Sequence, residues 1–183
     1  GALHAGEEAF HDTGDALSAV ASIISGANWL ERLLGAAPTR VAFAATKADH
    51  LHQSQHAALT AITEALVREA RDRAAFSGAE VAAMSLAGLR ATVEEMVERD
   101  GEALPMVRGR LLSTGKQAAM YPGELPSDPA RLLSPARKGA DRWLDADFAL
   151  MAFAPARLNL RPGEGPPHIR LDRAAEFLIG DRL

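Results

Sequence analysis

Two short apolar runs with a helical pattern between them limit the fold of this chain more than any other feature of its sequence. The runs are "RVAFAAT" (40–46) and "AEVAAMS" (79–85), and both are continuous rather than alternating, as in strands that are covered on both faces. From Leu59 to Ala70, apolar residues recur at the spacing of one helical face. The order strand, helix, strand predicts a right-handed crossover and two parallel strands, which is the α/β class.

Hydrophobic spacing and turn residues predict further elements on both sides of this unit. A long helix is expected between Thr13, as its N-cap, and Gly35, and another helix over "LRATVEEMVERDG" (89–101). A C-terminal helix is expected from Arg173, with Asp172 as its cap. Two strands are expected at "LPMVRGRLLS" and "DFALMAFAP", on either side of the proline-rich loop "YPGELPSDPARLLSPARKG".

The composition excludes several classes of protein. A formal net charge of −4 and a pI near 5.9 argue against a nucleic-acid binder, which needs clustered lysine and arginine. The chain has no cysteine, so disulfides, thiolate metal sites and a cysteine nucleophile are excluded. No apolar stretch approaches twenty residues and no signal peptide is visible, so a soluble protein of one domain, without a membrane span, is expected.

Three polar residues, Thr46, Lys47 and Asp49, lie at the carboxyl end of the first predicted strand, at the edge of an α/β sheet where ligands bind. A carboxylate can accept two parallel hydrogen bonds, and guanine presents two adjacent donors, its N1–H and its N2 amine. Asp49 is therefore predicted to select guanine, because the unprotonated N1 of adenine would leave this carboxylate unpaired. Lys47 is expected on the same side of an extended loop, where its methylenes can cover one face of the base.

A second polar position ends the second predicted strand. Ser85, in "SLAG", is followed by a backbone N–H at a predicted helix start, which can meet the guanine carbonyl. An (N/T)KxD motif followed by a strand that ends in serine is typical of the guanine-specificity half of a P-loop GTPase. The alternative is structural, with Lys47 and Asp49 as a solvated loop pair and Ser85 as a helix N-cap.

A wider resemblance points to the same class. The segments "FAATKADHLH", "LRAT", "PGELPSDP" and "GPPHIRLDRAAEFLIGDRL" resemble the YcjX family of bacterial P-loop GTPases, from about Arg40 to Leu183. The resemblance implies a cytoplasmic, stress-associated protein that binds GTP or GDP and is often encoded beside a membrane-protein partner. It also implies base-recognition positions, with Thr where most GTPases have Asn and Ser-Leu where they have Ser-Ala: Thr46, Lys47, Asp49, Ser85 and Leu86.

The resemblance also implies a domain organisation. The expected fold is α/β, a P-loop NTPase-like three-layer sandwich with mainly parallel strands, of which the chain is the C-terminal part. Residues 1–13 are expected to form a loop, 14–100 the base-recognition βα units, and 101–183 a proline-rich region specific to the family.

The phosphate-binding half of such a site is missing from the sequence. Phosphoryl transfer needs a glycine-rich loop, its lysine, and a hydroxyl and an aspartate on Mg²⁺. The nearest string is "GRLLSTGKQ" (109–117), which has one residue too many between its glycines and Gln where the metal-binding hydroxyl belongs. We therefore expect Mg²⁺ to bind only through an N-terminal part that precedes this chain in the family. For the chain alone we expect no GTP hydrolysis and at best weak nucleotide binding.

Two other functions compete with this interpretation. One is an α/β scaffold module that binds a protein partner and has no nucleotide function. The other is a metal hydrolase built on the H-x-H-x-x-x-H pattern of His50, His52 and His56, although a polar loop without metal is the favoured interpretation of that pattern. A basic stretch around "LLSPARKG" is expected to be a solvated face.

Overall fold

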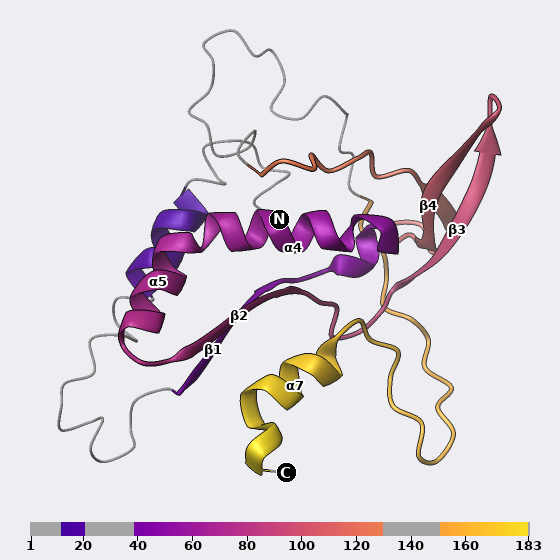
Figure 1. Cartoon of the computed structure of the whole chain (residues 1–183). Coiled ribbons are helices and arrows are strands. Elements are labelled where there is room, and N and C mark those ends of the chain that lie inside the picture. The colour runs from indigo at the N-terminus through magenta and orange to yellow at the C-terminus, as the bar shows by residue number, and fades with distance from the viewer. Residues whose placement is uncertain (1–11, 21–38, 130–150, 183) are drawn as a thin grey trace, which may run out of the picture.

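The computed structural model describes residues 12–20, 39–129 and 151–182 (Figure 1). Residues 12–20 are helical, so Thr13 lies inside this helix rather than at its N-cap. The predicted continuation to Gly35 and the basic stretch around "LLSPARKG" lie outside the described residues. The elements that follow are β1 (Arg40–Ala45), η1 (Ala48–His50), η2 (Gln53–Gln55), α4 (His56–Leu66), α5 (Arg68–Phe76), β2 (Glu80–Ser85), β3 (Thr92–Arg99), β4 (Glu102–Arg110), β5 (Gln117–Met120), α7 (Leu171–Ile179) and η3 (Gly180–Arg182).

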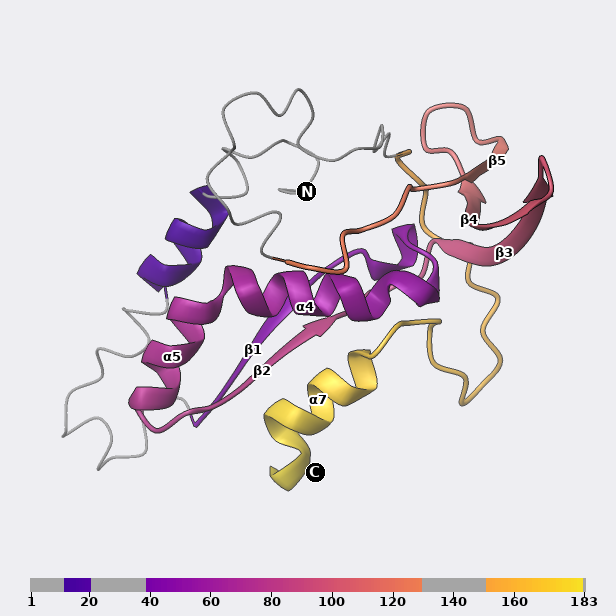
Figure 2. The same cartoon turned by 45° about the horizontal axis from the view of Figure 1, so that its top comes forward.

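The two predicted strands pair in parallel, as expected. β1 and β2 run in register from Arg40 opposite Glu80 to Ala45 opposite Ser85. Helices α4 and α5 cover one face of this pair and α7 lies against the other, which gives three layers (Figures 1 and 2). This double cover explains why both strands are apolar throughout rather than alternating.

The predicted helix after β1 is divided in two. Helix α4 ends at Leu66 and α5 begins at Arg68, because Val67 leaves the helical conformation at φ −94° and ψ 11°. Val67 and Ala70 are buried and pack against Phe43 of β1, so the bend brings both residues onto the sheet.

The predicted helix over 89–101 is wrong, because this segment forms β3 and the turn to β4. The two strands pair antiparallel, and Asp100 and Gly101 connect them with φ of 54° and 83°. Positive φ at both central residues is the twist-matched hairpin turn that an Asp-Gly pair favours. Val93 and Val97 fit helical spacing, but as β-branched residues they also suit a strand, and the turn decides between the two.

Among the described residues, the strands form two separate sheets. β1 and β2 make the parallel sheet, and β3, β4 and β5 make an antiparallel sheet in that order. The expected strand at 104–113 is confirmed as β4, whereas the described part of "DFALMAFAP" contributes only a bridge between Phe153 and Leu111. The chain is therefore a mixed α/β protein rather than one dominated by parallel strands within its described part.

The C-terminal helix starts earlier than predicted. Helix α7 begins at Leu171, and its N-cap is Arg170 in the left-handed conformation, with φ 55° and ψ 18°. Asp172 therefore lies in the first turn instead of capping the helix. The reason lies in the contacts of Arg170, whose guanidinium reaches the end of β2.

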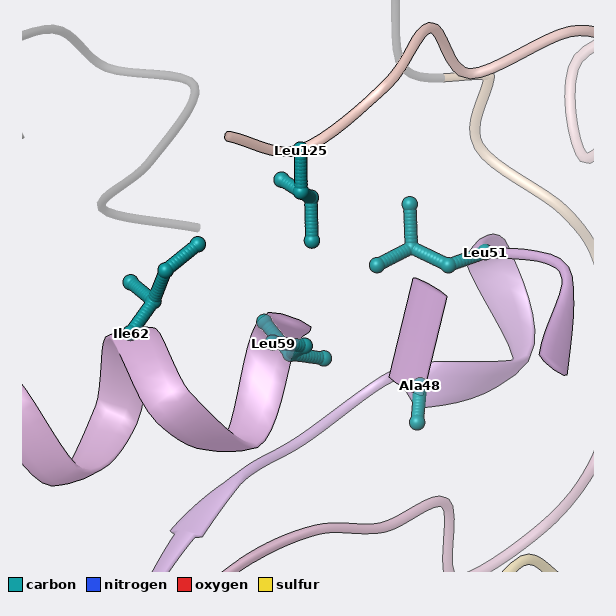
Figure 3. Close-up of a cluster of buried hydrophobic side chains, with 5 residues drawn as sticks. All are labelled: Ala48, Leu51, Leu59, Ile62 and Leu125. Carbon is teal, nitrogen blue, oxygen red and sulfur yellow. The ribbon is translucent and has the colours of Figure 1, made fainter. Parts of the chain in front are cut away.

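A buried cluster joins the turn after β1 to α4 (Figure 3). Its members come from three separate segments of the chain: Ala48, Leu51, Leu59, Ile62 and Leu125. Gln55 fixes the segment that carries Leu125, because its side-chain Nε2 donates to the carbonyl of Gly123 at 2.6 Å and its Oε1 accepts from the N–H of Leu125 at 2.7 Å. Ala48 and Leu51, on either side of Asp49 in the sequence, are thus part of the hydrophobic core.

A second cluster connects the antiparallel sheet to the same turn. Phe153 packs with Val107 and Met120, and its ring meets the ring of His50 edge to face at a centroid distance of 5.4 Å. Gly109 of β4 allows this close approach, because a Cβ at that position would lie 2.5 Å from Cδ1 of Phe153. Only a residue without a side chain fits there.

Substitution of Gly109 by Ala is therefore expected to destabilise the fold by about 1–3 kcal/mol, the usual cost of overpacking a core. Urea denaturation measures this change in the free energy of unfolding. Gly165→Ala is the matched control, because no atom lies within 4 Å of a Cβ there. Adding Phe153→Leu to Gly109→Ala should recover part of the loss, and a Gly109→Ala protein as stable as the control would contradict the close packing.

Candidate functional site

The turn after β1 separates Lys47 from Asp49. Lys47 is exposed and has a left-handed backbone, with φ 60° and ψ 37°, and η1 follows it at once. The same turn carries Asp49 inward until its exposed fraction is 3%. The expectation that both side chains lie on one side of an extended loop is wrong, because the left-handed backbone of Lys47 and the η1 turn replace the extended conformation. Thr46 is exposed next to Lys47.

Asp49 ties the end of β1 to the beginning of β3. Its Oδ2 accepts a hydrogen bond from the N–H of Ala91 at 2.8 Å, and its backbone carbonyl accepts one from the hydroxyl of Thr92. The carboxylate is therefore held in one orientation by a backbone donor that lies 42 residues further along the chain.

The two predicted loops meet at the carboxyl edge of the parallel sheet. Ala45 lies opposite Ser85, the N–H of Leu86 donates to the carbonyl of Ala45 at 2.9 Å, and the N–H of Ala48 donates to the carbonyl of Leu86 at 3.1 Å. The structure thus brings Thr46, Lys47 and Asp49 next to Ser85 and Leu86.

The free backbone N–H expected after Ser85 is engaged. The N–H of Leu86 is bonded to Ala45, and the N–H of Ala87 donates to the carbonyl of Ile169 at 3.0 Å. The Leu86 bond continues the pairing of β2 with β1, and a β-bridge between Ala87 and Ile169 stands where the helix start was predicted.

The side chain of Ser85 faces the interior and is fully buried. Its Oγ accepts from Nη1 of Arg170 at 2.5 Å and from the hydroxyl of Thr60 at 3.2 Å, and it donates to the carbonyl of His56 at 3.3 Å. Arg170 was not among the residues predicted from sequence. It is the arginine of "PHIRLD", and no local sequence pattern identifies Ser85, 85 positions earlier, as its partner.

The three histidines of the H-x-H-x-x-x-H pattern lie in different surroundings. Nε2 of His56 lies 2.9 Å from the carbonyl of Ala48, and Nδ1 of His52 lies 3.0 Å from the hydroxyl of Ser54. His50 is buried, and within the described chain its Nδ1 has no hydrogen-bond partner. In the ranges that the structure describes, no three histidine, aspartate or glutamate side chains converge as metal ligands would.

Comparisons with known proteins identify the family. A family model described as "YcjX-like family, DUF463" matches residues 1–183, the whole chain. The chain belongs to the YcjX-like family. Membership confirms the resemblance found in the sequence motifs. It also places the chain beside curated proteins whose names state a nucleotide-dependent activity.

Two relatives are both named "Ras-like GTPase YcjX". The one from Escherichia coli (strain K12) is 38% identical over 183 residues, which is 99% of this chain and 37% of the relative. The one from Shewanella oneidensis (strain MR-1) is 31% identical over 186 residues, which is 100% of this chain and 36% of the relative. The chain thus spans little more than a third of the length of these YcjX relatives. None of its described helices has the length and apolarity that crossing a membrane requires.

The buried imidazole of His50, in the turn after β1, makes the stability of the fold depend on pH. Burial lowers the pKa of His50 below its ordinary value of 6.5; the Asp49 carboxylate opposes this shift and Lys47 adds to it. The unfolded chain then binds a proton that the folded chain resists, so the free energy of unfolding falls as the pH drops below 6.5. Well above that pH His50 is neutral in both states and contributes no pH dependence.

We therefore expect His50→Phe, which keeps an uncharged ring against Phe153, to reduce the loss of stability between about pH 7.5 and about pH 5. Urea denaturation at both pH values measures the difference. His168→Phe makes the same change at an exposed histidine and serves as the matched control. Equal slopes for His50→Phe and wild type would show that His50 titrates alike in the folded and unfolded states.

Proposed function

We propose that the chain forms the base-recognition part of a GTP- and GDP-binding protein. The observation that carries this proposal is the meeting of the Thr46–Asp49 turn and the Ser85–Leu86 segment at the carboxyl edge of two parallel strands, joined by the bond from Ala48 to Leu86. Ligands of open α/β sheets bind at this edge. The relatives named as Ras-like GTPases support guanine as the base.

Asp49 is the residue that selects the base in this proposal. Each carboxylate oxygen has two lone pairs, so the bond from Ala91 leaves Asp49 able to accept from the N1–H and N2 amine of guanine. The bond also fixes the carboxylate, so little orientational freedom is lost on binding. Adenine would leave a buried carboxylate facing an acceptor, which is costly.

The other predicted residues have supporting roles. Lys47 is exposed beside the turn, and its methylenes can lie on one face of the base. Thr46 flanks it, Leu86 fixes the turn through its carbonyl, and Ser85 acts from the interior rather than as a direct ligand.

GTP hydrolysis and Mg²⁺ binding belong to the whole protein in this proposal. They would need the parts of the longer relatives that this chain does not span. A P-loop NTPase-like sandwich, a cytoplasmic location, a role in stress and a membrane-protein partner are further predictions from the family resemblance. The parallel pair with helices on both faces is compatible with that sandwich.

A second candidate function is a scaffold module without a nucleotide role. The observation that favours it is that the polar side chains at this edge already have partners inside the protein, Ala91 for Asp49 and Arg170 for Ser85. Such bonds also suit a site that is preorganised for a ligand. Base selectivity separates the two functions.

We expect the purified chain to bind GDP in preference to ADP, and Asp49→Asn to weaken GDP binding. A bidentate base contact is worth about 1–3 kcal/mol, or about 5- to 150-fold in affinity. Asn places a donor NH₂ group beside an acceptor carbonyl, so the variant should gain affinity for xanthosine diphosphate, whose base carries a carbonyl in place of the N2 amine. Saturation-transfer NMR with the three nucleotides in competition measures these preferences.

Asp100→Asn is the matched control, because it makes the same change at an exposed position, in the turn that connects β3 and β4. It should bind the three nucleotides as the wild type does. If ADP competes as well as GDP, or if Asp49→Asn alters no preference, the scaffold function replaces nucleotide recognition.

A further inference from the structure

The segment before α7 lies along the end of β2, where the second base loop begins (Figure 2). Ala87 and Ile169 exchange two backbone hydrogen bonds, of 3.0 Å and 2.9 Å, and the N–H of Arg90 donates to the carbonyl of Pro167 at 2.8 Å. The C-terminal motif is therefore part of the edge at which Thr46–Asp49 and Ser85–Leu86 meet.

Arg170 makes the closest side-chain contact between this motif and the sheet. Its Nη1 donates to the hydroxyl oxygen of Ser85 at 2.5 Å and to the carbonyl of Ser85 at 3.2 Å. In the stretches that the structure covers, no carboxylate lies at ion-pair distance from Arg170, so Ser85 is its hydrogen-bonding partner there. A hydrogen bond from a charged donor is stronger than a neutral one.

A chain of buried hydrogen bonds leads from Ser85 to the turn that carries Asp49. The hydroxyl of Ser85 donates to the carbonyl of His56 at 3.3 Å, and the ring of His56 reaches the carbonyls of Ala48, at 2.9 Å, and Leu51, at 3.3 Å. Both acceptors are carbonyls, so Nε2 of His56 carries the proton. The two carbonyls lie on either side of Asp49.

We propose that Arg170 is a positioning residue for the guanine-recognition turn and acts on Asp49 through Ser85 and His56. This assignment rests on the proposed function. It gives the motif "PHIRLD" a role in the site without contact with the nucleotide. The left-handed backbone of Arg170, uncommon for a residue with a side chain, aims its guanidinium at Ser85.

Helix α7 has other contacts that hold it in place. Ala174 is buried, the helix packs on β1, and Arg40 of β1 forms an ion pair of 2.6 Å with Asp181 just beyond its end. Loss of the Arg170 side chain is therefore expected to leave α7 docked. The effect should appear in the turn rather than throughout the fold.

Amide hydrogen exchange without nucleotide tests the positioning directly. In Arg170→Met, exchange at Ala48 and Leu51 should rise by about tenfold relative to Val107 in β4, because the turn loses its support while the distant sheet does not. Arg170→Lys keeps a positive donor and should recover part of the protection. Arg173→Met, an exposed arginine of the same helix, is the matched control and should leave both amides unchanged.

Binding then tests the link to recognition. At temperatures well below unfolding, Arg170→Met should lower the ratio of GDP to ADP affinity, and Arg170→Lys should restore it in part. Unchanged exchange at Ala48 and Leu51, a uniform rise that includes Val107, or an unchanged affinity ratio would each overturn the proposal. If Arg170→Met does not fold, Ser85→Ala replaces it, with the same expected results and the same contradicting ones.

The two proposals fail in different ways. A wild-type chain that binds GDP and ADP equally refutes nucleotide recognition, and it therefore also ends the role of Arg170 in specificity. A wild-type chain that prefers GDP while Arg170→Met retains both its exchange pattern and its preference refutes only the positioning role.

Discussion

The parallel pairing of β1 with β2 is the interaction on which the rest of this structure depends. It sets Ala45 opposite Ser85, so the two polar segments that follow the strands emerge side by side. Parallel strands need cover on both faces, and α4, α5 and α7 provide it. After β1 the turn at Lys47 carries Asp49 into the interior, where it is a buried carboxylate with a fixed backbone donor.

The sequence predicted those elements whose burial is evident from the apolar residues of the segment itself. Continuous apolar runs identified both parallel strands, and the polar residues at their ends identified the edge at which a site is proposed. The helix prediction over 89–101 is wrong because Val93 and Val97 fit both the helical and the strand period, and only the Asp100–Gly101 turn distinguishes the two. The inward path of Asp49 depends on the backbone of Lys47, and the Arg170 contact joins residues 85 positions apart, so neither has a local signal.

The site combines a rigid interior with an exposed rim. Ser85, His56 and Ala48 are buried and joined by hydrogen bonds, whereas Thr46 and Lys47 are exposed. A recognition site benefits from this division, since groups that are already ordered lose little entropy when a ligand binds. The same division is found in a purely structural corner of a fold, and this is why base selectivity, rather than geometry alone, distinguishes the two candidate functions of this YcjX-like chain.

The arrangement of contacts along the chain has a consequence for the order of folding. The β3–β4 hairpin closes over two residues and is expected to form within microseconds, whereas β1 and β2 must first close a loop over residues 46–79. The turn around Asp49 depends on contacts with segments that are distant in the chain, because its partners include Ala91 and, through Ser85, Arg170 near the C-terminus. We therefore expect the corner that carries Asp49 to be the last part of the described structure to reach its native geometry.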